Sequence, residues 1–181
     1  MENSTKTKWA LDPTHSEISF KVKHLMITNV KGVFKEFEAT VYTQGNDFNT
    51  FDIEFSLNTA SVDTGAADRD AHLRSADFFD AENYKQISFK GKSIEKAGSD
   101  GNYTLTGDLT IKGITNPVKL SVEFAGLMKD PWGNEKAGYS IEGKINRKDW
   151  GLNWNATLEA GGLLVSDEVK ISGEVQLVKQ S

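Results

Sequence analysis

Apolar and polar side chains alternate along most of the chain with a period of two, the pattern of β-strands that have one buried and one solvated face. Between Glu17 and His24 the residues Ile18, Phe20 and Val22 share one face, which ends in the histidine. The same alternation returns in the segments 33–41, 51–58, 87–89, 103–111, 118–124, 139–145 and 169–177. In the first of these, Val33, Phe37, Ala39 and Val41 are expected to share the apolar face. The sequence therefore predicts about eight strands.

Short turn signals separate these segments at 45–47, 98–102, 112–113 and 131–134, which favours antiparallel connections between neighbours. A meander of eight strands with one apolar face each removes its exposed edges by closing into a barrel. We therefore predict an all-β fold, an eight-stranded antiparallel up-and-down β-barrel. Because alternation also fits two packed sheets, a sandwich is the alternative.

One short helix is expected at 66–75, with Thr64 and Gly65 as its cap and acidic residues in its first turn. In this reading Arg69 and Asp70 form ion pairs that fix the helix. At 181 residues the chain fits a single β-barrel domain over 1–181, with 1–8 as a flexible N-terminus.

Composition removes several classes of function. A net charge of -5 provides no basic surface for nucleic acid, and the absence of cysteine excludes disulfides and thiolate chemistry. No stretch approaches the roughly 18 apolar residues of a membrane-spanning helix. We expect no cofactor and no metal. The N-terminus lacks a signal-peptide pattern, so the expected location is cytoplasmic, or periplasmic if a signal peptide has been removed. A homodimer is left open.

Four glycines interrupt the apolar faces of the predicted strands, namely Gly91, Gly107, Gly143 and Gly173. Such glycines either allow a bend or leave space beside the backbone, so an internal cavity and a solid core both remain open. Few charges share these faces, so an occupant would be apolar. Burying a tail of roughly a dozen carbons contributes ~10 kcal/mol of binding free energy. Association itself costs ~4–15 kcal/mol, so useful affinity requires a long tail.

The residues expected to line such a cavity are the aromatic and aliphatic side chains of the inward faces, together with one histidine. They are Phe20, Val22, His24, Phe37, Phe55, Leu73, Phe78, Phe79, Phe89, Leu105, Leu109, Leu120, Phe124, Tyr139 and Ile141. Among them Leu73, Phe78 and Phe79 are expected to close one barrel end as a lid. His24 is expected to offer a polar contact near the mouth, or to be a satisfied core residue.

Catalytic candidates are weak. Asp12, His15 and Ser16 have the residue types of a hydrolytic triad, but such a turn more often bonds to its own backbone. His15, His24 and His72 have no recognised metal-site spacing. Arg147 is expected to pair with a carboxylate such as Asp70 or Asp149.

Taken in order, several segments resemble the YceI-like polyisoprenoid-binding family. The resemblance is carried by Asp12, His15 and Ser16 with His24 at the end of the first strand, by 63–65 and 69–80, by Gly107–Gly113 and by Asn146–Gly151. These motifs cover nearly the whole chain. Lys85 departs from the family pattern, which usually has proline there.

The resemblance implies a lipocalin-like barrel that binds a long isoprenoid or similar amphiphile (a polyisoprenoid, a prenyl quinone, or a fatty acid or amide), with no catalytic role. The chain is thus expected to be a lipid carrier or storage protein and not an enzyme. Two alternatives stay open, an enzyme that acts on a lipid-like substrate through His15 or His72, and a solid-core structural module.

Overall fold

The computed structural model describes residues 6–25, 27–98, 101–155 and 164–180. The strands are β1 (Lys6–Leu11), β2 (Glu17–His24), β3 (Thr28–Phe34), β4 (Phe37–Gln44), β5 (Asp47–Asn58), β6 (Val62–Asp63), β7 (Gln86–Lys96), β8 (Asn102–Ile111), β9 (Ile114–Lys129), β10 (Glu135–Asn146) and β11 (Val165–Lys179). The helical elements are α1 (Ala67–Arg74) and the 3-10 turns η1 (Pro13–His15), η2 (Thr59–Ser61) and η3 (Arg147–Trp150).

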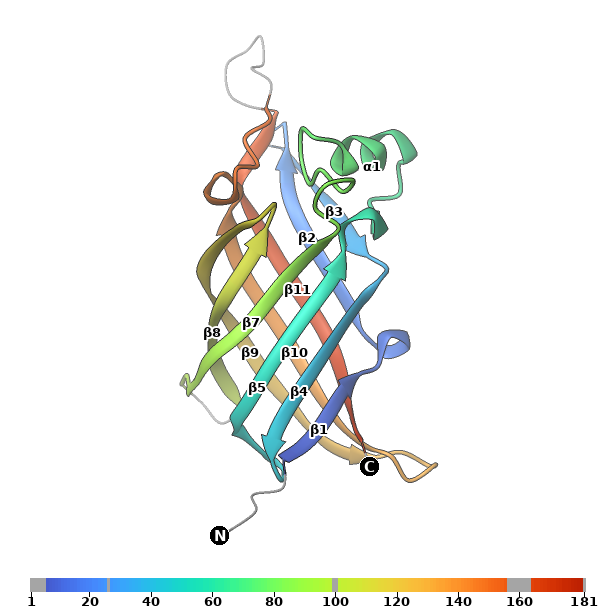
Figure 1. Ribbon diagram of the computed structural model, residues 1–181, viewed down its shortest axis with the longest axis vertical. Helices are drawn as coiled ribbons and strands as arrows, with labels where there is room; N and C mark the ends of the chain where they lie inside the picture. The colour runs from blue at the N-terminus through green and yellow to red at the C-terminus, as the bar shows by residue number, and fades with distance from the viewer. Residues whose placement is uncertain (1–5, 26, 99–100, 156–163, 181) are drawn as a thin grey trace.

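Eight of these strands form a closed ring in the order β1-β4-β5-β7-β8-β9-β10-β11, and β1 pairs with β11 to complete it. Every pairing is antiparallel, and Figure 1 shows the strands tilted around a common axis. The prediction of an eight-stranded antiparallel barrel is confirmed, and the alternative of a sandwich is wrong.

The first three passes of the chain along the barrel are each broken into two strands. β11 pairs with β2 along one part of its length and with β1 along another, so β1 and β2 act as one strand interrupted by η1. In the same way β3 continues into β4, and β5 into β6. With these breaks counted, the chain makes eight successive up-and-down passes.

The break between β3 and β4 changes which side chains face inward. The alternation placed Val33 on the same face as Phe37, Ala39 and Val41, but Phe34 lines the barrel interior with Ala39 and Val41. Val33 points to the other face, because successive residues of β3 alternate. Residues 35–36 separate the two strands and change whether even- or odd-numbered residues face inward. The expected position of Val33 on the inner face is therefore wrong.

The N-terminal end of the barrel begins earlier than expected. Lys6, Thr7 and Lys8 belong to β1 and pair with β4, so this part of the expected flexible N-terminus is a strand. Residues 1–5 of that expectation lie outside the described residues. Trp9 on β1 is fully buried, and its Nε1 donates to Thr43 Oγ1 at 3.0 Å. The strand β1, which carries Trp9, lies towards the end of the barrel opposite α1 (Figure 1).

The helix α1 lies beside the other end of the barrel, near the β2–β3 hairpin (Figure 1). It is capped at Ala66 without a side-chain hydrogen bond, so the expected capping by Thr64 is wrong. Instead Asp70 accepts from Thr64 N–H at 2.8 Å and from its hydroxyl at 2.6 Å, and Arg69 donates to Thr64 Oγ1 and O. Within the described ranges Arg69 and Asp70 form no ion pair, which corrects that expectation.

The turn between β1 and β2 is organised by Asp12. Its carboxylate accepts from Thr14 N–H at 3.0 Å and from the Thr14 hydroxyl at 2.7 Å, and lies 2.8 Å from His15 Nδ1. The hydrogen bonds from Thr14 and then from His15 lower the pKa of Asp12 to about 2. Because the backbone N–H of Asp12 donates to Gln176 O on β11, this carboxylate steadies the passage from β1 to β2.

We predict that replacing Asp12 with Asn lowers the free energy of unfolding by about 1 kcal/mol at pH 6. The folded pKa lies below the unfolded value near 3.8, so the stabilisation is present above about pH 4 and is lost as the pH falls towards 2. Urea unfolding of both proteins at pH 6, 4 and 2.5 measures the difference. A gap of the same size at pH 2.5 would contradict the assignment.

Candidate functional site

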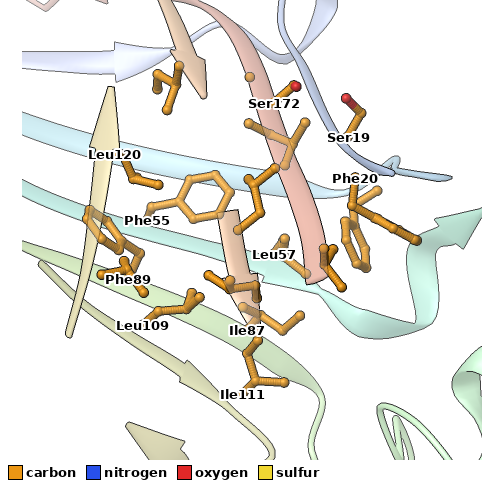
Figure 2. A pocket seen from close by; sticks show the side chains of 18 of the residues that line it. Ser19, Phe20, Phe55, Leu57, Ile87, Phe89, Leu109, Ile111, Leu120 and Ser172 are labelled. Atoms are coloured by element: carbon orange, nitrogen blue, oxygen red, sulfur yellow. The ribbon is translucent and has the colours of Figure 1, made fainter. Parts of the chain in front are cut away.

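The barrel interior holds a cavity of about 600 Å³, within the range of small-molecule sites. Figure 2 shows Phe55, Ile87, Phe89, Leu109 and Ile111 gathered along one part of its wall. Apolar side chains from strands all round the barrel form most of the lining. The barrel is therefore not a solid core, and the alternation of the strands supplies an apolar inner surface.

The glycines of the inner face do not themselves create the empty space. A Cβ on Gly107 would lie 2.4 Å from Phe89 Cζ, and one on Gly143 would lie 2.5 Å from Leu120 Cδ2. Gly32, which the sequence reasoning missed, lies under Phe20 in the same way, at 2.3 Å from its Cζ. At these three positions the glycine allows a large neighbouring side chain to lie against the wall, whereas Gly173 itself lines the cavity.

Most of the predicted lining residues come together around this cavity. The thirteen that line it are Phe20, Val22, His24, Phe55, Leu73, Phe78, Phe79, Phe89, Leu105, Leu109, Leu120, Tyr139 and Ile141. Phe37 and Phe124 are absent from the lining. Phe37 packs against the hydrophobic core, and the Phe124 ring packs on Tyr139 at 5.1 Å. Contact of the predicted lining residues with a ligand stays a prediction.

Charged and polar residues line the cavity at the end beside α1. They come from the end of β2, from α1 and from η3, and are Lys23, His24, Asp68, Arg69, His72 and Arg147. Several of them, including Lys23 and Arg69, are exposed, so the cavity reaches solvent here. We call this end the mouth. The opposite part is lined by apolar residues and by Tyr139, whose pKa is raised by burial.

His72 links the lid to the segment after η3. Its Nε2 lies 2.9 Å from Asp77 Oδ2, and its ring meets Phe78 and Trp154 edge-on at 5.0 and 4.6 Å between centroids. Leu73, Phe78 and Phe79 line the cavity beside it. The expectation of an apolar lid at one barrel end thus agrees with where these three residues lie. Trp154 was missed, because its segment has no strand or helix periodicity.

Arg147 holds the backbone at the mouth. Its guanidinium is buried and donates to Ser166 O and Trp154 O at 2.9 Å and to Leu152 O at 2.5 Å. Burial lowers its pKa, and the Asp167 carboxylate, 3.9 Å away, acts in the opposite direction. The expected pairing with Asp70 or Asp149 is wrong: the carboxylate beside it is Asp167, and most of its bonds go to carbonyls.

The candidate hydrolytic residues do not assemble at the cavity. Asp12 and His15 are hydrogen-bonded, but Ser16 Oγ accepts from Gln176 N–H at 3.0 Å, and none of the three lines the cavity. In the part of the chain that is described, no group of three or more metal-binding side chains lies together. No helix there is long and apolar enough to cross a membrane.

A family model described as a YceI-like domain matches residues 9–177. The chain belongs to the YceI-like family. Among its relatives, a UPF0312 protein of Staphylococcus aureus is 37% identical over 171 residues, which cover 94% of this chain and 96% of the relative. The expected family resemblance is confirmed, and the match spans the β1–β11 ring.

Solved structures of YceI-like proteins share the barrel. The Campylobacter jejuni YceI protein aligns over 100% of both chains with a TM-score of 0.73 and 33% identity. A polyisoprenoid binding domain from Saccharophagus degradans covers 95% of this chain and 98% of its own, with a TM-score of 0.67 and 16% identity. The second likeness concerns the fold alone.

We predict that replacing Arg147 with Met lowers the free energy of unfolding by about 3 kcal/mol, because several buried carbonyls lose their donor. Arg147→Lys should recover only part of this, since an ammonium cannot match the fork of the guanidinium. Urea denaturation measures both. A loss below about 1 kcal/mol in the Met variant would show that these carbonyls find other partners.

Proposed function

We propose that this YceI-like barrel binds one long-chain amphiphile, such as a polyisoprenoid, a prenyl quinone or a fatty acid or amide, and serves as its carrier or store. The observation that carries the proposal is the division of the cavity, which is apolar through most of its length and has its charged side chains at the mouth. An amphiphile has the same division. This function needs no catalytic step.

The division of the cavity sets the orientation of the ligand. The tail would run inward past Phe20, Phe55 and Phe89, towards the barrel end where Trp9 is buried. The head group would stay at the mouth beside His24 and His72, where hydrogen-bonding side chains meet solvent. Burying tail methylenes contributes about 0.8 kcal/mol each, so affinity should rise with tail length until the cavity is full.

The comparisons support the proposed ligand class in a limited way. The domain from Saccharophagus degradans is described as polyisoprenoid binding, and it shares this barrel. Its sequence is only 16% identical to this chain. The reason to propose the same ligand class here is therefore the apolar cavity and not a set of matched residues. The carrier or storage role follows from the enclosure of a tail that would be insoluble in water.

We predict that Ala39→Trp abolishes lipid retention, because Ala39 lines the cavity and an indole there would occupy the space of the tail. The neighbouring Glu38 is exposed, so Glu38→Trp adds the same side chain outside the barrel and should retain the lipid. Native mass spectrometry followed by solvent extraction measures the bound species. Thermal unfolding of both variants verifies that each is folded.

The same measurement decides the proposal itself. The wild-type protein, purified from several hosts and then loaded with a polyprenol, prenyl quinones or fatty amides, should retain one of them in a one-to-one complex. If it never retains a lipid, the proposed function is wrong.

A further inference from the structure

The outer surface of the barrel carries a row of lysines that face one another across four neighbouring strands. Lys144 of β10 is directly opposite Lys170 of β11, Lys170 is opposite Lys21 of β2, and Lys21 is opposite Lys31 of β3. All four are exposed. They point outward, because the residues on either side of Lys21 along β2 line the cavity.

Such a row is unfavourable for folding, since like charges directly opposite each other destabilise a sheet. It is also unexpected in a chain with a net charge of -5. The two outer lysines are partly neutralised, Lys31 by Glu17 at 3.0 Å and Lys144 by Glu168 at 3.5 Å. Over the described residues, Lys21 and Lys170 have no carboxylate within 4 Å, so the centre of the row keeps its charge.

The row lies close to two exposed apolar side chains at the mouth. In the hairpin between β2 and β3, Leu25 is 39% and Ile27 is 79% exposed. The Leu25 N–H donates to Leu164 O at 2.9 Å, and the Ile27 N–H to His24 O at 3.2 Å. Because Leu164 and His24 both line the cavity, the hairpin tip is part of its rim.

We propose that this surface docks on an anionic lipid bilayer, with Leu25 and Ile27 entering the interface and the lysines contacting the head groups. We call the lysines Lys21, Lys23, Lys31, Lys144 and Lys170 the basic face. The inference rests on the proposed function, because the bilayer is where an amphiphile enters or leaves the mouth.

Geometry allows both parts of the surface to act together. Lys21 is four residues from Leu25, roughly 13 Å along the strand, and Lys23, which is exposed and also borders the mouth, lies between them. With the tip in the head-group region, which is about 5–8 Å deep in each leaflet, the lysines lie just outside it, and their attraction to anionic head groups extends over about 8–10 Å before salt screens it. A bilayer fits better than an acidic protein, because the basic face borders both the mouth and exposed apolar side chains.

The basic face is tested by Lys21→Gln/Lys170→Gln. Each lysine near an anionic surface contributes about fivefold to partitioning, so the double variant should bind roughly 25-fold more weakly to vesicles of 70% phosphatidylcholine and 30% phosphatidylglycerol. Removing the like charges should leave the fold at least as stable. The matched control is Lys90→Gln/Lys96→Gln on β7, across the ring from β11, which changes the charge equally and should bind as the wild type does.

The apolar tip is tested by Ile27→Ser, with Met128→Ser as its control. Met128 is 76% exposed and lies on β9 towards the opposite barrel end, so the two substitutions remove similar exposed side chains. We expect Ile27→Ser to weaken vesicle binding several-fold and Met128→Ser to leave it unchanged. Flotation at 0.1 M and 0.5 M salt, with full-length protein, measures all four variants.

The outcomes separate this inference from the proposed function, because retained lipid is measured on the same samples by solvent extraction. Wild type that retains lipid yet does not float with anionic vesicles overturns the docking surface and leaves the proposed function intact. Equal binding to pure phosphatidylcholine vesicles, or unchanged binding by Lys21→Gln/Lys170→Gln, also overturns it. Vesicle binding that is lost in this variant and in high salt, whether or not a lipid is retained, supports the docking surface.

Discussion

The closure of the barrel depends on β11, which pairs with β10 on one side and with both β1 and β2 on the other. Only the end of β11 reaches β1, from Leu177 to Lys179, and there Trp9 is fully buried. Without these pairs, β1 and β11 would each present an open edge. Closure lets the backbone ladder hold the walls together, so the interior does not have to be filled.

The strands were predictable because the alternation that defines them is also what makes one face apolar. The segment 51–58 illustrates this, since Phe51, Ile53, Phe55 and Leu57 all line the cavity. Prediction failed where the chain breaks its period. The parity change at 35–36 reversed the expected side of Val33, and β1 was missed because its six residues precede a turn containing proline and carry only a short alternation.

The mouth was less predictable than the walls, since its residues are brought together by turns and not by periodicity. Arg147 and Trp154 reach it from η3 and the irregular segment that follows. An arginine in such a sequence suggests a carboxylate partner, but its fork matches several carbonyls equally well. The glycines were a poor guide to the position of the cavity. The space that a glycine leaves on the inner face can be occupied by a neighbouring side chain, as Phe89 does at Gly107.

A cavity of about 600 Å³ means that the empty barrel forgoes packing contacts that a solid core would make. An occupant that restores them binds the folded state and not the unfolded chain, so occupancy should stabilise the barrel by linkage. The same contacts that hold a tail also slow its departure, because each methylene must leave an apolar wall. In the proposed function, an apolar rim at Leu25 and Ile27 would shorten the exposure of the tail to water as it leaves, which relates the position of the rim to the apolar interior.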